Sequence, residues 1–341
     1  MKRSLILSLL LVSFLLGSPA FSSNFEKAID AYQQGDYATA IKWYRLSAEQ
    51  GDSTSQSNLG SMYDQGKGVD QDYVAAVKWY RLSAAQGHST AQINLGSMYE
   101  KGNGVDQDYA SAVYLFRLSA KQGHSAAQHN LGVMYEKGKG VAQDYASAVK
   151  WYSLSAQQGY SPAQNNLGVM YDHGNGVVQD YASAVKWFKL SAQQGYASGQ
   201  HNLGIMYGQG KGVAQDYASA VKWFRLSAEQ GDAIGQYNLG VMYDQGNGVD
   251  QDYVAAVKWY RLSAEQGDST SQYNLGVMYD LGEGVAQDFA RAHMWASIAA
   301  LQGNNNAIKL QNSLVKKMSP TQRETAQRLT PECVVKNYIG C

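Results

Sequence analysis

The octapeptide GNGVDQDY occupies residues 102–109 and recurs without change at residues 246–253. Related loops of the form G-x-G-V-x-Q-D-[Y/F] begin at Gly66, Gly138, Gly174, Gly210 and Gly282. Two glycines and two aspartates in so short a stretch could hold a phosphate group or a cation, or could form a bend between two helices. The sequence on either side of the loop decides among these alternatives.

The whole chain repeats in step with this loop, at intervals of 36 residues. The tripeptide Asn-Leu-Gly occurs seven times, starting at residues 58, 94, 130, 166, 202, 238 and 274. Tryptophan recurs at residues 43, 79, 151, 187, 223, 259 and 295, and Leu115 replaces it once. A fixed period of roughly 20–50 residues indicates a solenoid or another array of repeats.

Each repeat is predicted to contain two helices. Ala91, Leu95 and Tyr99 follow one another at intervals of four residues, which places them on one stripe of a helix. Gly102 then stands where a left-handed residue is expected to end that helix, and Asp108 has the position and the chemistry of the next N-cap. We expect the loop to be the bend between the two helices, with its valine packed beneath it.

The repeat pattern resembles that of a known family. It reads A-x-x-x-L-G-x-x-Y-x-x-G-x-G-V-x-x-D, then A-x-x-W and a closing glycine, as in the Sel1-like repeat, a relative of the tetratricopeptide repeat. The resemblance covers about residues 52–303 as seven repeats of 36 residues. It implies an all-α fold, a right-handed α/α superhelical solenoid of stacked helix-turn-helix repeats, and a function in protein–protein interaction.

The two ends of the array differ from its middle. Residues 21–51 have the shorter turn Y-x-x-G-D-Y at 32–37, so we expect an N-terminal capping pair closer to a plain tetratricopeptide repeat. Residues 304–341 are expected to cap the C-terminus with a helix at 304–317 and a second helix that starts at Ser319 and reaches about Leu329. Cys333 and Cys341, the only cysteines, are expected to form one disulfide; two reactive thiols are the alternative.

The N-terminus predicts export. Lys2 and Arg3 precede the apolar run Leu5–Leu16, and small residues follow at Ser18 and Ala20, so residues 1–20 are predicted to be a signal peptide. We therefore expect a periplasmic or secreted protein of a bacterial envelope, without an integral membrane span. The chain has 28 basic and 28 acidic side chains, which gives no reason to expect a nucleic-acid partner. The oligomeric state is left open.

The motifs that could carry catalysis all have a structural alternative. The loop has Gln107 where a G-x-G-x-x-G motif needs its third glycine, so it is not expected to bind phosphate. S-x-x-K, a motif of penicillin-binding enzymes, occurs at 147–150, 183–186 and 219–222, but no S-D-N or K-T-G accompanies it. The six histidines are expected to be surface residues without a shared metal. We therefore predict no enzyme activity, no metal site and no cofactor.

One face of the first helix in each repeat is the predicted binding surface. The residue two positions before the core leucine lies about 200° from it around the helix, so we expect it to face away from the core. It varies among the copies, whereas Gln56 and Asn58 on either side of it are the same in all seven. The variable residues are Ser57, Ile93, His129, Asn165, His201, Tyr237 and Tyr273.

The same face is expected to carry an apolar row and an acidic row. The first consists of Ser61, Ser97, Val133, Val169, Ile205, Val241 and Val277. The second, interrupted at Gly208, consists of Asp64, Glu100, Glu136, Asp172, Asp244 and Asp280. These rows predict a concave face that binds a basic or amphipathic peptide; neutral variation and a solvated acidic edge are the alternatives. Charge reversal at Glu100, Glu136 and Asp172 is expected to weaken that binding.

The function we expect is therefore an exported scaffold or adaptor that binds a peptide or protein partner along this concave face. Two other functions stay open at this point. One is an enzyme that acts on peptidoglycan or β-lactams through the S-x-x-K helices. The other is non-catalytic binding of peptidoglycan or another glycan through Tyr237 and Tyr273.

Overall fold

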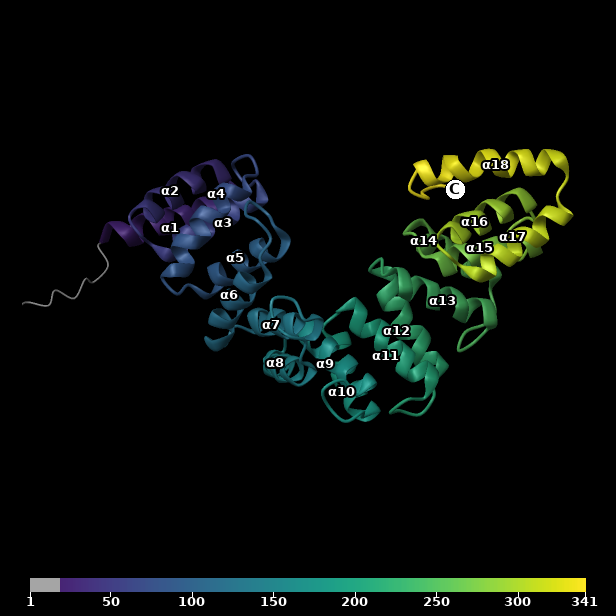
Figure 1. Ribbon diagram of the computed structural model, residues 1–341, viewed down its shortest axis with the longest axis horizontal. Helices are drawn as coiled ribbons and strands as arrows, with labels where there is room; N and C mark the ends of the chain where they lie inside the picture. The colour runs from purple at the N-terminus through teal and green to yellow at the C-terminus, as the bar shows by residue number, and fades with distance from the viewer. Residues whose placement is uncertain (1–18) are drawn as a thin grey trace, which may run out of the picture. The chain divides into compact units, whose positions relative to one another are not determined.

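The computed structural model describes residues 19–341, and these residues form helices, turns and loops without a β-strand. The all-α solenoid of paired helices is confirmed, with eighteen helices in the described part of the chain (Figure 1). The predicted signal peptide, residues 1–20, lies outside the described residues except for its last two positions.

The chain divides into two compact units, one up to Asp144 and one from Tyr145 to Cys341. The helices of the first unit are α1 (Pro19–Gln33), α2 (Tyr37–Glu49), α3 (Ser53–Gln65), α4 (Tyr73–Ala85), α5 (Ser89–Lys101), α6 (Tyr109–Lys121) and α7 (Ser125–Lys137). The helices of the second unit begin with α8 (Tyr145–Gln157), α9 (Ser161–His173), α10 (Tyr181–Gln193), α11 (Ala197–Gln209), α12 (Tyr217–Glu229) and α13 (Ala233–Gln245). They continue with α14 (Tyr253–Glu265), α15 (Ser269–Leu281), α16 (Phe289–Leu301), α17 (Asn305–Lys317) and α18 (Pro320–Val335).

In the 36-residue repeats, we call the first helix the A helix (α3, α5 and the odd-numbered helices up to α15) and the second the B helix. Each A helix ends at a left-handed glycine; Gly102, with φ +74°, ends α5. The backbone N–H groups of Ala110 and Ser111 donate to Asp108 Oδ1, so Asp108 is the predicted N-cap of α6. Val105 packs against the core of its repeat, as expected. The loop is therefore a bend between helices.

The second glycine of the loop has a further role, because it contacts the preceding repeat. A Cβ atom at Gly104 would lie 2.4 Å from the carbonyl carbon and oxygen of Tyr73, at the start of the preceding B helix. Six other loops, at Gly68, Gly140, Gly176, Gly212, Gly248 and Gly284, have the same close approach to the backbone of the preceding repeat. The loop thus joins the helices within one repeat and also fixes the distance to the repeat before it.

A ladder of buried glutamines holds successive helices together. In α11, Gln200 Nε2 donates to the carbonyl of Ala192 near the end of α10, at 3.3 Å. Gln200 Oε1 accepts from Gln230 Nε2 at the C-cap of α12, at 2.7 Å. One side chain therefore binds the end of the preceding B helix and the end of the following one. The invariance of this glutamine among the repeats is explained by these two contacts.

The C-terminal cap matches its prediction except for its length. Ser319 and Gln322 form the predicted capping box at the start of α18. The structure also contains the predicted disulfide between Cys333 and Cys341. However, α18 continues to Val335 with Pro331 inside it, so the predicted end near Leu329 was wrong. The longer helix carries Cys333, which is 2% exposed, into the core cluster around α16.

Candidate functional site

The face of the A helices that we predicted to bind a partner is built from four residues in each repeat. In α3 these are Ser57, Asn58, Ser61 and Asp64, and the other A helices carry the equivalent residues at intervals of 36. We call this surface the A-helix face and describe it separately in each unit. Its asparagines and the residues of its apolar row are half-buried throughout.

The variable position is much less exposed than the sequence indicated. Ser57, Ile93 and Asn165 are buried, with exposed fractions of 3%, 9% and 7%. The side chains of His129, His201, Tyr237 and Tyr273 are half-buried. The expectation that all seven residues point away from the packed protein into solvent was therefore wrong.

Neighbouring helices cover this position from two directions. Asn202 Nδ2 donates to Asn165 Oδ1 at 2.8 Å, and Asn238 Nδ2 lies 2.9 Å from His201 Nε2, so the next A helix reaches over it. On the side of the B helices, aromatic rings approach it, as in the pair Tyr237–Tyr260, whose ring centroids are 6.2 Å apart. The angle of about 200° places a residue relative to a single partner helix, whereas α11 contacts the B helices and the A helices on both sides of it.

The invariant asparagines follow the variable residues along the A-helix face. Because the two asparagine bonds join helices one repeat apart, the variable side chain sets the hydrogen-bonding partner of the next repeat. An asparagine accepts this bond at residue 165 and a histidine nitrogen takes part in it at residue 201. Variation at this position therefore changes both the surface and the contact between repeats.

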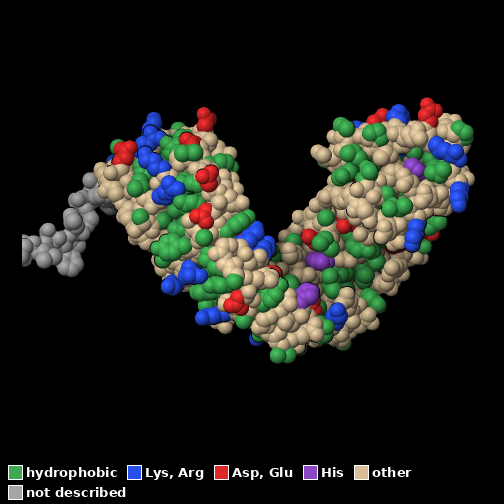
Figure 2. Space-filling model, in the orientation of Figure 1, with side chains coloured by type: hydrophobic (Ala, Val, Ile, Leu, Met, Phe, Trp, Pro, Cys, Tyr) green, Lys and Arg blue, Asp and Glu red, His purple; other side chains and the backbone are tan. Residues whose placement is uncertain are grey.

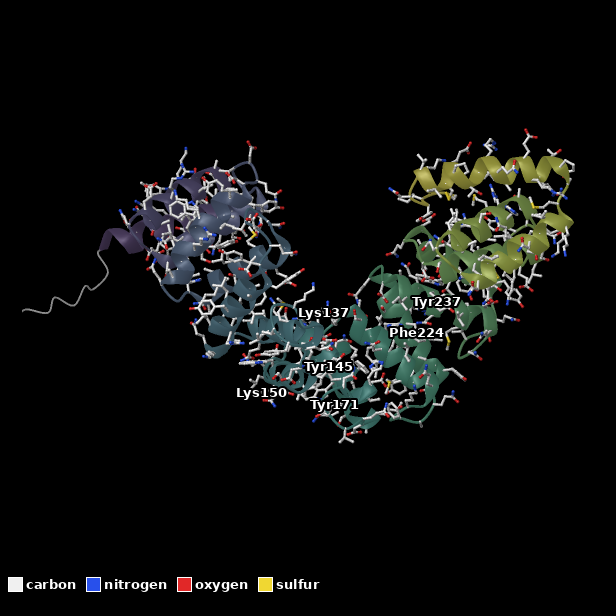
Figure 3. The ribbon with its side chains drawn as sticks, in the orientation of Figure 1. Lys137, Tyr145, Lys150, Tyr171, Phe224 and Tyr237 are labelled. Carbon is white, nitrogen blue, oxygen red and sulfur yellow. A yellow bond between two sulfur atoms is a disulfide. The ribbon has the colours of Figure 1, made fainter. Side chains whose placement is uncertain are left out.

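The ring of His201 also packs on Phe224 of α12, with the centroids 6.0 Å apart. Burial lowers the pKa of both His201 and His129, and a weaker attraction of Asp232 for His201 acts in the opposite direction. Phe224 and Tyr237, labelled in Figure 3, come from α12 and α13 and give this part of the second unit an aromatic character. The expectation that these histidines are surface residues was wrong for His129 and His201.

The acidic row is half-buried and is partly occupied by other side chains. Tyr260 Oη donates to Asp244 Oδ2 at 3.0 Å, which places a hydroxyl beneath this carboxylate. The hydroxyl of Tyr80 is buried beside Asp64 without a hydrogen bond of normal geometry, and burial raises the pKa of both groups. Tyrosines of the B helices therefore reach the acids from the core side.

Cations neutralise some of the acids. Lys317 Nζ lies 2.8 Å from both carboxylate oxygens of Asp280, which is 8% exposed, so this acid belongs to the C-terminal cap. The charge of Lys101 lowers the pKa of Asp64 against the larger effect of burial. Among the described residues, the basic side chain within ion-pair distance of the Asp172 carboxylate is that of His173, at 4.0 Å. The acids best placed to meet a partner in the second unit are therefore Asp172 and Asp244.

Sequence reasoning missed two other sets of contacts. Gln107 Nε2 donates to the carbonyl of Glu100 at 2.7 Å, and all seven loop glutamines make the same bond to the end of their A helix. Arg81 donates to the hydroxyl of Tyr99 at 2.8 Å, and this pair recurs in several repeats. The signal for the first set was the invariance of the loop glutamine in all seven repeats, and the signal for the second was the recurrence of arginine 18 residues before the tyrosine in several repeats.

The S-x-x-K residues are engaged in helix capping and in stacking. Ser183 Oγ and Ser219 Oγ each donate to the aspartate of their own N-cap at 2.6 Å. The ammonium groups of Lys186 and Lys222 lie over the neighbouring tryptophan rings, 5.4 and 5.6 Å from the centroids. In these two copies the serine and the lysine therefore do not interact as a nucleophile and its base would.

Acidic and basic side chains are interspersed on the visible surface, without a large area of one sign (Figure 2). Within residues 19–341 no group of three or more histidine, cysteine or acidic side chains is placed to hold a metal ion. No helix in this part of the chain is long and apolar enough to cross a bilayer.

Comparison with known proteins places these features in a family. The Sel1 repeat matches eight consecutive segments, 23–52, 53–88, 89–124, 125–160, 161–196, 197–232, 233–268 and 269–304. The first match includes the segment that we expected to be closer to a plain tetratricopeptide repeat. No curated protein matches the chain.

Two solved structures are similar at the level of sequence. A Sel1 repeat protein from Oxalobacter formigenes is 30% identical, with a TM-score of 0.66 over 70% of this chain and 96% of that chain. A protective antigen of uropathogenic Escherichia coli with the Sel1-like repeat fold is also 30% identical, over 93% of this chain and 85% of that chain, with a TM-score of 0.47.

Proposed function

This chain belongs to the Sel1 repeat family, and on that premise we propose that it is an exported scaffold whose A-helix face binds an extended peptide segment of a partner protein. Sel1-like repeats mediate protein–protein interaction, and proteins built from them are typically non-catalytic. The disulfide between Cys333 and Cys341 fits an extracellular or periplasmic location. Export and the peptide ligand are the parts that require testing.

The observation that supports a peptide ligand is the distribution of variation within the repeat. The loop glycines and the buried glutamines are the same in all seven repeats, whereas the variable row changes from serine to isoleucine, histidine, asparagine and tyrosine. The side chains that remain half-exposed in this row are His129, His201, Tyr237 and Tyr273. A uniform framework that carries different side chains at one surface position suits recognition of a ligand with an irregular sequence.

The second unit offers the most specific part of this surface. Gly208 stands between Asp172 and Asp244 in the acidic row, and a Cβ atom there would have only the Cβ atom of Ala220 nearby, at 3.7 Å. Packing therefore does not require a glycine at this position, and there is open space beside it. We propose that an apolar side chain of the partner fills this space and that basic side chains face the two acids.

The spacing of the repeats predicts the spacing of the ligand. Packed helices lie about 10 Å apart, so Asp172 and Asp244, two repeats apart, are separated by roughly 20 Å. An extended peptide rises about 3.3 Å per residue and spans that distance in about six residues. The expected ligand has two basic residues about six positions apart with an apolar residue between them.

Binding of fluorescent peptides to the mature chain tests this proposal. A peptide with two lysines six residues apart is expected to bind at least about ten-fold more tightly than one with the same composition and the lysines three apart, since each buried charge pair contributes over 1 kcal/mol. Asp244→Lys is expected to weaken binding by about the same factor. Asp250→Lys makes the same change of charge at an exposed loop residue and is the control.

Equal binding of the two peptides, or equal losses in Asp244→Lys and Asp250→Lys, would contradict a peptide site on this face. Secretion of a reporter fused to residues 1–25 tests export separately. A reporter that stays in the cytoplasm would remove export from the proposal and would leave the binding surface unchanged.

A further inference from the structure

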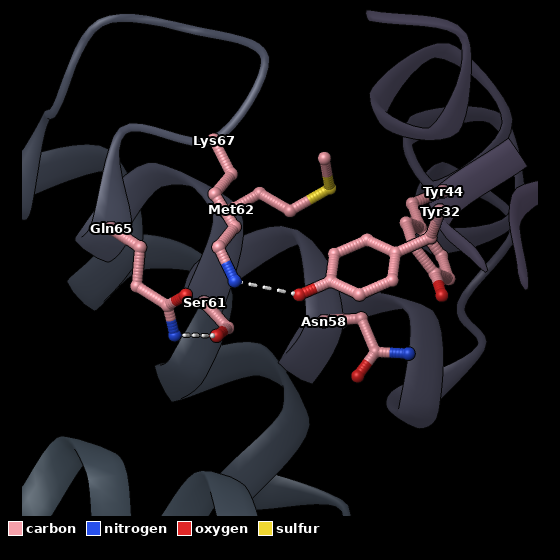
Figure 4. Close-up of a pocket in the computed structure, with 7 residues that line it drawn as sticks. All are labelled: Tyr32, Tyr44, Asn58, Ser61, Met62, Gln65 and Lys67. Carbon is pink, nitrogen blue, oxygen red and sulfur yellow. Dashed lines mark hydrogen bonds between the residues drawn. The ribbon is translucent and has the colours of Figure 1, made fainter. Parts of the chain in front are cut away.

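The N-terminal end of the A-helix face contains a cavity of about 180 Å³ between α1, α2 and α3 (Figure 4). Seven residues line it: Tyr32, Tyr44, Asn58, Ser61, Met62, Gln65 and Lys67. Asn58 and Ser61 also belong to the A-helix face, so the cavity is continuous with the surface that we propose as the peptide site. The volume exceeds the approximately 30 Å³ of one water molecule several-fold.

Three side chains of the cavity, Lys67, Tyr32 and Ser61, carry hydrogen-bond donors. Lys67 Nζ donates to Tyr32 Oη at 2.9 Å, and this bond raises the pKa of Lys67, which keeps its ammonium group charged. An ammonium group has three N–H donors, so two remain for another acceptor. Tyr32 accepts from the lysine, and among residues 19–341 no acceptor for its own O–H is found. Ser61 Oγ accepts from Gln65 Nε2 at 2.9 Å, and its hydroxyl also lies close enough to Tyr80 to influence the pKa of that tyrosine, so the hydroxyl can donate either to Tyr80 or to a ligand.

The cavity contains a cation but no carboxylate. Within the described part of the chain no acidic side chain lies within 4.0 Å of Lys67 Nζ, since this lysine is absent from all ion pairs there. The first helix pair also lacks the acid that most of the 36-residue repeats carry near the end of their A helix. At the end of α3 the sequence is Tyr63-Asp64, whereas α1 ends with Tyr32-Gln33. The first pair therefore has a glutamine where the 36-residue repeats start their acidic row.

Other loop lysines show what is special about Lys67. The ammonium groups of Lys139 and Lys211 lie over the rings of Tyr109 and Tyr181, 5.0 and 5.5 Å from the centroids, as Lys67 lies 5.7 Å from that of Tyr37. Neither of these two has a tyrosine hydroxyl as a hydrogen-bond partner in the described structure. Lys67 alone of the three also contacts the ring of Tyr32, at 5.4 Å, and lines this cavity.

We propose that this cavity binds a carboxylate group of the partner peptide, held by the ammonium group of Lys67 and the hydroxyls of Tyr32 and Ser61. A charged donor together with hydroxyl donors is the set that a carboxylate requires, because an ionised carboxylate only accepts hydrogen bonds. The identity of the ligand as a peptide rests on the proposed function; the affinity for a carboxylate does not. The carboxylate belongs either to the C-terminus of the partner or to an acidic side chain.

The first experiment uses acetate as the probe and the full mature chain. Two-dimensional NMR spectra are recorded during titration with sodium acetate, with sodium chloride and with sodium phosphate at equal ionic strength. Acetate is expected to give saturable shifts that are about ten-fold weaker in Lys67→Met. The matched control Lys139→Met is expected to retain the wild-type response, and Lys67→Arg to retain most of it.

Several outcomes would overturn the site. These are shifts that do not saturate, equal responses of Lys67→Met and Lys139→Met, and saturation by phosphate at lower concentration than by acetate. Tyr32→Phe keeps the ring and removes the hydroxyl, so an undiminished acetate response in this variant would exclude Tyr32 from the site. Circular dichroism of each variant shows whether it is folded before its response is compared.

The second experiment identifies the source of the carboxylate. One peptide is prepared with a free C-terminus, with an amidated C-terminus, and with an amidated C-terminus plus an internal glutamate. Binding of the free form alone assigns the C-terminus, and binding of the glutamate form assigns a side chain. If binding of none of the three peptides depends on Lys67 while binding of acetate does, the assignment to a peptide carboxylate is wrong and the anion site is retained. Peptide binding that is unchanged by Asp244→Lys would instead contradict the proposed function.

Discussion

The loop and the A-helix face have the same period but treat variation in opposite ways. Gly104 and its equivalents are invariant because the backbone of the preceding repeat lies where a side chain would begin. The variable row contains serine, isoleucine, histidine, asparagine and tyrosine, and Asn165, His201 and Tyr237 each have a partner on the next A helix or on the B helix of their own repeat. At the loop glycine, invariance thus reflects contact with the backbone of the preceding repeat, whereas the variable row contacts side chains that can accommodate different partners.

The largest effect is expected where the loop contacts the preceding repeat. Gly104→Ala places a Cβ atom against the backbone of Tyr73 and also puts an alanine at a positive φ. Gly123→Ala also puts an alanine at a positive φ, but no atom lies within 4 Å of its Cβ atom. We expect losses of about 3 kcal/mol or more for the first and about 1–2 kcal/mol for the second. Urea unfolding of both variants measures the difference. Equal losses would show that the glycine serves the turn alone.

A smaller effect is expected within the glutamine ladder. Gln200→Leu removes the hydrogen bond to the carbonyl of Ala192 and one of the two acceptors of Gln230 Nε2, so we expect a loss of about 1–3 kcal/mol in the free energy of unfolding. Gln193→Leu, at an exposed position of α10, is the control and is expected to change stability by less than about 0.5 kcal/mol. A Gln200 variant as stable as the control would mean that apolar packing compensates for both lost hydrogen bonds.

The smallest effect is expected on the A-helix face itself, as a dependence of stability on pH. Burial lowers the pKa of His201 in the folded state, so the unfolded chain takes up the proton first as the pH falls below about 6.5. Stability is therefore complete above that pH and decreases toward pH 5.5. His201→Asn, which copies the natural residue at position 165, is expected to reduce this decrease. Unfolding midpoints at pH 7.5 and 5.5 measure it, and a variant as sensitive to acid as the wild type would contradict the burial.

The sequence predicts the fold well because its signals are local. A left-handed glycine, an N-capping aspartate and a stripe of apolar residues each act within one turn of the helix, and Gly102, Asp108 and Val105 all have the predicted roles. The disulfide was also predictable, since only two cysteines exist. The loop glutamines recur in all seven repeats and the arginine–tyrosine pairs in several, but the period does not show which group each side chain contacts.

The candidate surface was harder to predict because its environment is made by other repeats. The burial of Asn165 depends on Asn202, 37 residues later, and the environment of Asp280 depends on Lys317 in the cap. A helical wheel describes one helix and therefore could not predict either of these contacts with another helix. The pattern could show which residues share a face, whereas the cover that each receives follows from how closely the next helix packs.

The dependence of each repeat on its neighbours alone has a consequence for how the protein can change in length. Residues 42–56 and residues 258–272 are identical over fifteen positions, KWYRLSAEQGDSTSQ, and they lie six periods apart. A genetic exchange between the two corresponding stretches would remove six repeats while every remaining loop kept the same glycine contact and every remaining glutamine kept a partner. The two capping segments would be unaffected. The number of repeats is therefore a property that recombination can alter in one step without creating a new interface.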